Sequence, residues 1–265
     1  MGLDIGTALV TGASGGIGQA LAERFAIEGH DVVLVARREG RLREIAADLE
    51  ATHGITAHVV PTDLTDRDAR RTLYEDVTER DIAVDYLVNN AGVGTQGRFT
   101  DIDLDRDLGL VELNVAAPTH LAKLFARDMV ERGRGGVLTV SSTAAFQPGP
   151  YMATYYASKA YELSFSQGIH EELREDGVTA TVLCSGPVAT EFQERADMTD
   201  VPIGRQDGGL IRWMEPEAVA RIGYRGLAEG RAVVVPGTTN RLVRLAAKLL
   251  PSSLARRLAA RLNRR

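Results

Sequence analysis

Seven short apolar segments alternate along this chain with longer segments that have the period of an α-helix. The apolar segments, which we expect to be strands, are residues 7–10, 32–36, 57–60, 86–89, 136–140, 179–183 and 232–235. The expected helices lie near residues 17–28, 41–52, 67–79, 104–131, 153–175 and 217–228. Strands that are apolar throughout are buried on both faces of a sheet. The pattern predicts an α/β fold, a doubly wound parallel sheet of about seven strands in three layers and one domain.

Composition narrows the class of protein. With 265 residues and 44% hydrophobic content, the chain suits one sizeable domain. Cys184 is the only cysteine, so an internal disulfide is excluded, and the five histidines lack metal-ligand spacing, so we expect no metal. No uncharged apolar run approaches the roughly 18 residues of a membrane span, and a strand begins almost at once, leaving no room for a signal peptide. We therefore expect a cytoplasmic protein.

The basic charge is concentrated at one end of the sequence. Residues 230–265 hold nine Arg and Lys but no Asp or Glu, so a chain of net charge −5 carries −14 on its first 229 residues. Beyond a domain at 1–239, residues 240–265 read as two short amphipathic helices broken at Pro251. Three interpretations stay open. The leucines dock on the domain or on a second subunit, the helices make peripheral contact with an anionic membrane, or the end is disordered.

A glycine-rich turn, TGASGGIG, follows the first strand and opens the first helix. Glycines there permit a tight turn and let the backbone approach a pyrophosphate, while the helix N-terminus supplies N–H groups and partial positive charge. This position predicts a dinucleotide site. The contacts that we expect from the turn are Gly12, Ser14, Gly15, Gly16, Ile17 and Gly18.

The end of the second strand indicates which dinucleotide. An NAD site has an acid there, but this chain has Ala36 followed by Arg37 and Arg38. Two guanidinium groups suit a 2′-phosphate, so we expect NADP(H), with Arg37 as the closer contact and Ser14 as a helper. The alternative is that the arginines only solvate the strand end or begin the next helix.

Asp63 follows the third strand and has two interpretations. It either caps the helix that begins near Arg67, although it lies early for a cap, or bonds the adenine with the Leu64 backbone beside it.

Tyr155 and Lys159 lie four residues apart in a segment of helical period, which puts both side chains on one face. An ammonium beside a phenol stabilises the phenolate and lowers the pKa of the phenol from about 10. Such a tyrosine transfers a proton to or from an alkoxide near neutral pH. Tyr156 and Tyr151 lack this spacing to Lys159.

Further motifs complete a pattern: NNAG at 89–92, Asn114 in a helix, Ser142 thirteen residues before Tyr155, and Gly186, Pro187 and Thr190 after the sixth strand. With them the chain resembles the short-chain dehydrogenase/reductase family over nearly its whole length. The resemblance implies a Rossmann fold and cofactor contacts that also include Asn90, Ala91, Gly92, Tyr155, Lys159, Pro187, Val188 and Thr190. It further implies a homodimer or homotetramer, built through helices 104–131 and 153–175.

The resemblance also implies four catalytic roles. Tyr155 is the general acid and base, Ser142 holds the substrate carbonyl, Lys159 lowers the pKa of Tyr155 and bonds the nicotinamide ribose, and Asn114 supports a water that leads to solvent. Ser141 is the alternative to Ser142. Consecutive strand residues face opposite ways, and the spacing favours Ser142.

The substrate is the least determined part. We expect a lid near 185–215 and pocket walls from residues 144–151 and 188–214. The apolar candidates are Phe146, Tyr151, Phe192, Met198, Ile203, Ile211, Trp213 and Met214. The predicted function is reversible NADPH-dependent reduction of a hydrophobic ketone or 3-oxoacyl carbonyl to a secondary alcohol, without a nucleic-acid partner. The alternatives are a non-catalytic NADP(H)-binding regulator and a membrane-surface reductase of lipid-like substrates.

Overall fold

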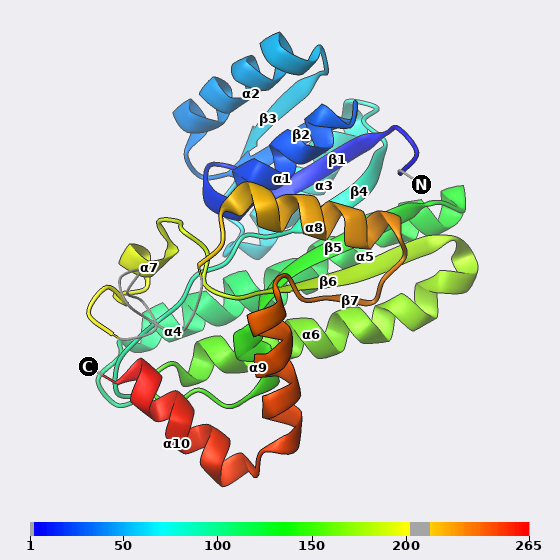
Figure 1. Ribbon diagram of the computed structural model, residues 1–265. Coiled ribbons are helices and arrows are strands. Elements are labelled where there is room, and N and C mark those ends of the chain that lie inside the picture. Colours follow the sequence, from blue (N-terminus) through cyan, green and yellow to red (C-terminus); the bar gives the residue numbers. More distant parts are fainter. Residues whose placement is uncertain (1–2, 202–212, 265) are drawn as a thin grey trace.

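Seven parallel strands form one sheet in the order β3-β2-β1-β4-β5-β6-β7 (Figure 1). The computed structural model describes residues 3–201 and 213–264. The strands are β1 (Thr7–Thr11), β2 (Asp31–Ala36), β3 (Ala57–Pro61), β4 (Val84–Asn89), β5 (Gly135–Ser142), β6 (Val178–Ser185) and β7 (Val233–Val234). Each boundary lies within two residues of the expected one, so the sequence pattern is confirmed. The chain builds β1 to β3 outward, then crosses back to place β4 beside β1.

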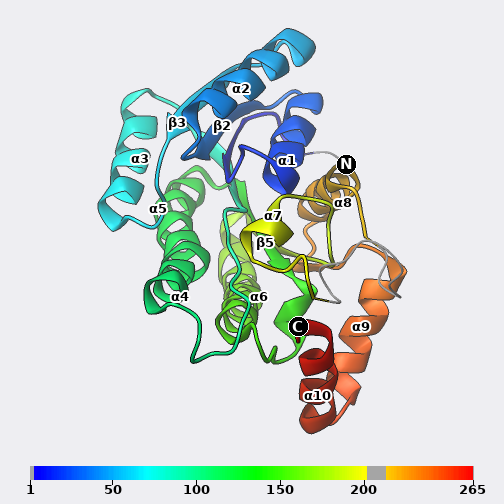
Figure 2. The ribbon, with the colours of Figure 1, turned by 90° about the vertical axis from the view of Figure 1, so that its left-hand side faces the viewer.

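Helices cover both faces of this sheet (Figure 2). One face packs against α1 (Gly16–Ile27), α2 (Glu39–His53) and α8 (Pro216–Ala228). The other packs against α3 (Arg67–Glu79), α5 (Ala117–Arg132) and α6 (Ala153–Leu173). Two separate buried clusters, one for each face, show that the three expected layers have formed. No helix among the described residues is both long and apolar enough to span a membrane.

The helix expected over residues 104–131 has the right extent but is not α-helical throughout. It consists of α4 (Leu104–Val111), a π-helical turn at Glu112–Ala116, and α5. Buried Arg70 supports this turn: its guanidinium donates to the Leu64 carbonyl at 2.9 Å and to the Glu112 carboxylate at 3.3 Å. Single π-helical turns of this kind are frequent at functional sites.

The basic C-terminal segment forms two helices, α9 (Thr238–Leu249) and α10 (Ser252–Asn263), that pack on the parent domain. The Gln96 side-chain amide donates to the Asn263 carbonyl at 2.9 Å, and the Asn263 amide donates to the Pro150 carbonyl at 3.0 Å. Ala255 and Ala259 are buried, whereas the leucines of both helices are exposed. The segment therefore docks, but through small residues and Asn263 rather than through the leucines.

The N-terminus of α3 is capped by Asp66. Its carboxylate accepts from the backbone N–H of Asp68 at 2.7 Å and of Ala69 at 3.2 Å. The Asp63 carboxylate instead accepts from the N–H and hydroxyl of Thr65, so the interpretation of Asp63 as the cap is wrong. The three residues between Asp63 and Arg67 put it beyond the reach of the free N–H groups of the helix.

Asp66→Ala will lower the free energy of unfolding by about 1 kcal/mol, because two N–H groups of the first turn lose their acceptor. Urea denaturation monitored by circular dichroism measures the change. Glu75→Ala, an exposed change in the same helix, is the control and should stay within a few tenths of a kcal/mol of the unmodified protein. Equal losses in both variants would contradict the cap.

Candidate active site

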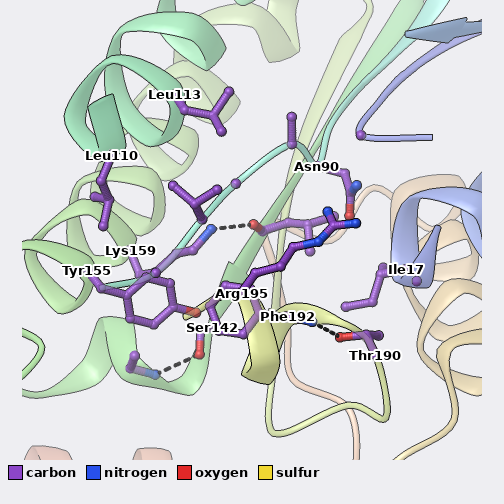
Figure 3. Close-up of a pocket in the computed structure, with 18 of the residues that line it drawn as sticks. Ile17, Asn90, Leu110, Leu113, Ser142, Tyr155, Lys159, Thr190, Phe192 and Arg195 are labelled. Atoms are coloured by element: carbon purple, nitrogen blue, oxygen red, sulfur yellow. Dashed lines mark hydrogen bonds between the residues drawn. The ribbon is translucent and has the colours of Figure 1, made fainter. Parts of the chain in front are cut away.

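A cavity of about 790 Å³ opens at the carboxyl ends of the strands (Figure 3). It runs from the glycine turn and the end of β2, past β4 and β5, to the segment after β6. The predicted residues that line it are Gly12, Ser14, Gly15, Gly16, Ile17, Arg37, Arg38, Asp63, Leu64, Asn90, Ala91, Gly92, Ser142, Tyr155, Lys159, Pro187, Val188 and Thr190. Gly18 and Asn114 do not line the cavity and lie behind the residues that do.

Two glycines allow the first turn to take its shape. Gly12 has a φ of +66°, which side chains rarely adopt. A Cβ on Gly18 would lie 2.3 Å from the Gly12 carbonyl oxygen and 2.4 Å from the Asn90 amide nitrogen, so Gly18 permits the close approach of α1. The same Asn90 amide donates to the Thr11 carbonyl at 2.9 Å, which ties the ends of β1 and β4 together.

The end of β2 contributes its arginines unequally. Arg38 lies against the glycine turn: its Nε donates to the Ser14 hydroxyl at 3.2 Å and its terminal nitrogen to the Ser14 carbonyl at 2.8 Å. Arg37 is largely exposed and lies 3.9 Å from the Asp63 carboxylate. Both line the cavity, but Arg38, not Arg37, is joined to Ser14.

The lining residues fit a dinucleotide. The N-terminus of α1 opens onto the cavity beside Gly15 and Gly16, which leave the backbone accessible to a pyrophosphate. Arg37 and Arg38 line the cavity from the end of β2, Tyr155 and Lys159 line it from α6, and Arg106 and Arg195 are also among the lining residues.

Ser142 and Tyr155 come together at the far end of the cavity. Ser142 ends β5, and its hydroxyl accepts from the Ala144 N–H at 3.1 Å and faces the Tyr155 hydroxyl (Figure 3). Ser141 donates its hydroxyl to the Lys159 carbonyl at 3.0 Å, which fixes α6 against β5. The geometry therefore favours Ser142 over Ser141. The Tyr156 hydroxyl is directed to Asn263.

Asn114 is fully buried in the π-helical turn. Its side-chain oxygen accepts from the Val93 N–H at 3.0 Å, and its amide donates to the Val93 carbonyl at 2.9 Å and the Ser158 hydroxyl at 3.0 Å. Ser158 donates in turn to the Tyr155 carbonyl at 2.8 Å. The Asn114 side chain thus connects the segment after β4 to the helix that carries Tyr155.

Lys159 is buried and bonded to a carboxylate that we did not anticipate. Its Nζ donates to Glu162 at 2.9 Å and to the Val140 carbonyl at 3.1 Å, and it lies 5.8 Å from the centre of the Tyr155 ring. Glu162 is 3% exposed, and burial raises its pKa to about 7 although the Lys159 charge acts in the opposite direction. The two residues are three apart on α6, one turn of helix.

A family model described as short chain dehydrogenase matches residues 6–200. The chain belongs to the short-chain dehydrogenase family. A short-chain dehydrogenase of Pseudocercospora fijiensis is 36% identical over 188 residues, which are 70% of this chain, and the match spans only 60% of that relative's length.

Two solved structures of dehydrogenases cover more of the chain. A short-chain dehydrogenase of Sphingobium yanoikuyae in complex with NADPH is 31% identical with a TM-score of 0.81, covering 92% of this chain and 93% of that one. A bulky-bulky ketone specific alcohol dehydrogenase of Comamonas testosteroni is 30% identical with a TM-score of 0.76 and the same coverage. The whole sheet and its helices thus follow the dehydrogenase family.

The expectation that Lys159 lowers the pKa of Tyr155 stays a prediction. Burial raises the pKa of Tyr155, the Ser142 hydroxyl lowers it, and the negative charge of Glu162 raises it further. Glu162 bonds the Lys159 ammonium on which the expectation depends. The spacing from Tyr155 was enough to identify Lys159 in the sequence. The glutamate three residues after Lys159 was the sequence signal for its partner.

The apolar wall of the dehydrogenase cavity differs from the predicted one. Of the expected side chains, Phe192 and Met198 line it, and the Phe192 ring lies 5.4 Å from that of Tyr155. Phe146 packs against the cluster of Val182, Cys184 and Val235 instead, Met214 packs against the core, and Tyr151 and Trp213 are not lining residues. Ile203 and Ile211, with the rest of the lid between 202 and 212, lie outside the described residues.

Sequence reasoning missed the wall residues Leu110, Leu113, Met152, Val243 and Leu262. Leu110 and Leu113 had a signal, since they lie on the helix of Asn114 within one turn of it (Figure 3). Val243 and Leu262 had none, because only the docking of α9 and α10 brings them to the cavity.

Glu162→Gln will change how the stability of this protein depends on pH. The folded pKa of Glu162 is raised from 4.5 to about 7, so its contribution to stability is complete below 4.5 and is lost as pH rises through 7. Urea denaturation at about pH 5 and about pH 8 should show a smaller loss of stability in the Gln variant than in the unmodified protein. Glu171→Gln, at an exposed position on the same helix, is the control and should keep the original loss. An unchanged loss in Glu162→Gln would contradict the raised pKa.

Proposed function

We propose that this protein catalyses reversible NADPH-dependent reduction of a hydrophobic ketone to a secondary alcohol. One observation carries the proposal. The Ser142 and Tyr155 hydroxyls face each other beside an apolar cluster, in a cavity that Arg37 and Arg38 also line (Figure 3). Two polar hydroxyls on an apolar wall suit a substrate with one reacting oxygen and an otherwise apolar body.

The bound nicotinamide would supply the hydride that adds to the carbonyl carbon. Charge then develops on the carbonyl oxygen, where Ser142 donates a hydrogen bond and Tyr155 donates its proton. A phenol with a raised pKa stays protonated at neutral pH, which suits the direction of reduction. In the reverse direction Tyr155 must first lose this proton, so alcohol oxidation requires a higher pH.

Lys159 and Asn114 act behind this pair. The Lys159 ammonium lies 5.8 Å from the centre of the ring that becomes a phenolate after proton transfer, and the pairing with Glu162 fixes its position. The Asn114 side chain holds the Val93 backbone and, through Ser158, the carbonyl of Tyr155. We also propose that a water at Asn114 returns the proton from solvent to Tyr155.

A preference for NADPH over NADH is supported by charge. Arg37 and Arg38 follow β2 at the position where an acid would bond a ribose hydroxyl, and both line the cavity. Arg38 is held by Ser14, and its guanidinium lies 3.4 Å from the Glu191 carboxylate after β6. The NADPH complex of the Sphingobium relative supports the same cofactor.

The wall supports a large apolar ketone, of which a 3-oxoacyl chain is one example. Leu110, Leu113, Met152, Phe192 and Met198 surround the end of the cavity near Tyr155. The relative from Comamonas testosteroni is specific for bulky-bulky ketones. Such a substrate gains binding energy from apolar contact and needs only the carbonyl to be oriented.

Assembly as a homo-oligomer and a cytoplasmic location stay predictions. Leu104, Leu108 and Val111 are exposed on α4, and Tyr161 is exposed on α6, the two helices through which we expect a second copy to bind. Exposed apolar side chains grouped in this way are typical of subunit contacts.

Tyr155→Phe will lower kcat for ketone reduction by about a hundredfold to ten thousandfold, because the proton donor is removed. NADPH binding, measured by fluorescence titration, should be retained. Tyr156→Phe is the matched control, since its hydroxyl bonds Asn263 outside the reacting pair, and its activity should change far less. Full activity of Tyr155→Phe would favour the non-catalytic regulator.

Arg38→Ala and Arg37→Ala will each raise the KM for NADPH by about tenfold or more while changing the KM for NADH little, because a charged phosphate contact is lost. Steady-state kinetics with both cofactors tests this. Arg41→Ala, an exposed arginine on α2, is the control. Equal use of NADH and NADPH by the unmodified protein would contradict the preference.

A further inference from the structure

Helix α9 carries a row of leucines that faces away from the protein. Leu242, Leu245 and Leu249 are 65%, 52% and 74% exposed. Their spacing of three and four residues puts them on one face of the helix. Asn240, buried on the opposite face, donates to the Pro236 carbonyl at 2.7 Å and holds the helix against the domain. We call these three side chains the leucine face of α9.

Helix α10 repeats this arrangement. It docks through Ala255, Ala259 and Asn263, which are all buried, and leaves Leu254 and Leu258 exposed. Both views of the molecule place α9 and α10 together at one corner, beyond β7 and α6 (Figures 1 and 2). The docking contacts are thus made by small residues, and the large apolar side chains stay exposed among the residues that the structure describes.

The segment that carries these leucines holds only basic charged side chains. Residues 230–265 contain nine Arg and Lys and no acid, in a chain that is otherwise acidic. Arg241 on α9 and Arg257 and Arg261 on α10 are exposed beside the leucines. Leucines on one face with arginines beside them are the composition of helices that lie in the surface of a membrane.

Two occupants suit an apolar face of this kind, a bilayer or a second copy of the chain, and charge distinguishes them. A symmetric contact between two copies would bring together two segments that carry nine positive charges each and no negative ones, which repel. Anionic lipid headgroups attract the same segment. We propose that α9 and α10 bind the surface of an anionic lipid bilayer, with the leucine face of α9 inserted at the boundary of headgroups and acyl chains.

Bilayer contact would also bring lipid close to the cavity. Thr239, Asn240 and Val243 of α9 and Leu262 of α10 line the cavity, so the helices that bear the exposed leucines also form part of its wall. An apolar ketone dissolved in the bilayer then reaches Tyr155 without crossing water. This consequence rests on the proposed function, whereas the bilayer contact does not.

Co-sedimentation of the full chain with vesicles tests the proposal. Vesicles of equal parts phosphatidylglycerol and phosphatidylcholine should pellet the protein, and vesicles of phosphatidylcholine alone should pellet much less. Leu242→Ser, Leu245→Ser and Leu249→Ser together should lower the partition coefficient by about tenfold or more, because three apolar side chains are lost from the contact. The matched control replaces Ile5, Ile27 and Phe99 by Ser, which are exposed to similar extents on other parts of the surface. It should pellet like the unmodified protein.

Two outcomes would overturn the proposal. One is equal pelleting of the unmodified protein and the leucine-face variant on anionic vesicles. The other is absence of vesicle binding together with a fall in assembly size of the variant on size-exclusion chromatography, which would identify a second copy as the occupant. Turnover of a small water-soluble ketone is measured in parallel and should be unchanged in the variant, since the leucine face does not line the cavity. Vesicle binding without any turnover would count against the proposed function alone.

Discussion

All seven strands run in the same direction, so their carboxyl ends open onto a single edge of the sheet. Each chemical group of the site depends on this constraint. The glycine turn follows β1, the arginines follow β2, and Ser142 ends β5. A parallel sheet also requires a helix in each crossover, which is why the N-terminus of α1 is available beside the turn. The reversal of strand order at β1 and β4, held by Asn90 and Thr11, leaves the space in which the cavity lies.

The parts of the site that the sequence predicted are those determined by local spacing. Period and burial placed every strand within two residues, because a strand buried on both faces leaves an uninterrupted apolar run. The alternation of side chains along a strand distinguished Ser142 from Ser141. The helical spacing to Lys159 distinguished Tyr155 from Tyr156. Each of these distinctions needs only the geometry of one element. In the structure the Ser141 hydroxyl bonds the Lys159 carbonyl and the Tyr156 hydroxyl bonds Asn263.

Features that depend on contacts between distant segments could not be predicted in this way. The π-helical turn at Asn114 depends on Arg70, Val93 and Ser158, which come from three other segments of the chain. The raised pKa of Tyr155 depends on burial and on the charge of Glu162, and burial is not visible in a spacing. The docking of α9 and α10, which complete the cavity wall, could not be predicted either, because alanines rather than leucines make the contact with the domain.

Because of the position of α10, the residues that shape part of the cavity are separate from those that carry its two hydroxyls. The hydroxyls of Ser142 and Tyr155 belong to β5 and α6, within the sheet and one of its covering helices, whereas Leu262 reaches the same cavity from a helix joined to the domain at its periphery. Asn263 holds that helix through the Pro150 and Gln96 contacts, neither of which involves a proton-transfer group. Substitutions along α10 can therefore alter the shape of the chamber while the reacting hydroxyls keep their places. The residues of α10 that contact a bound molecule can therefore change while the two hydroxyls of the proposed reaction stay the same.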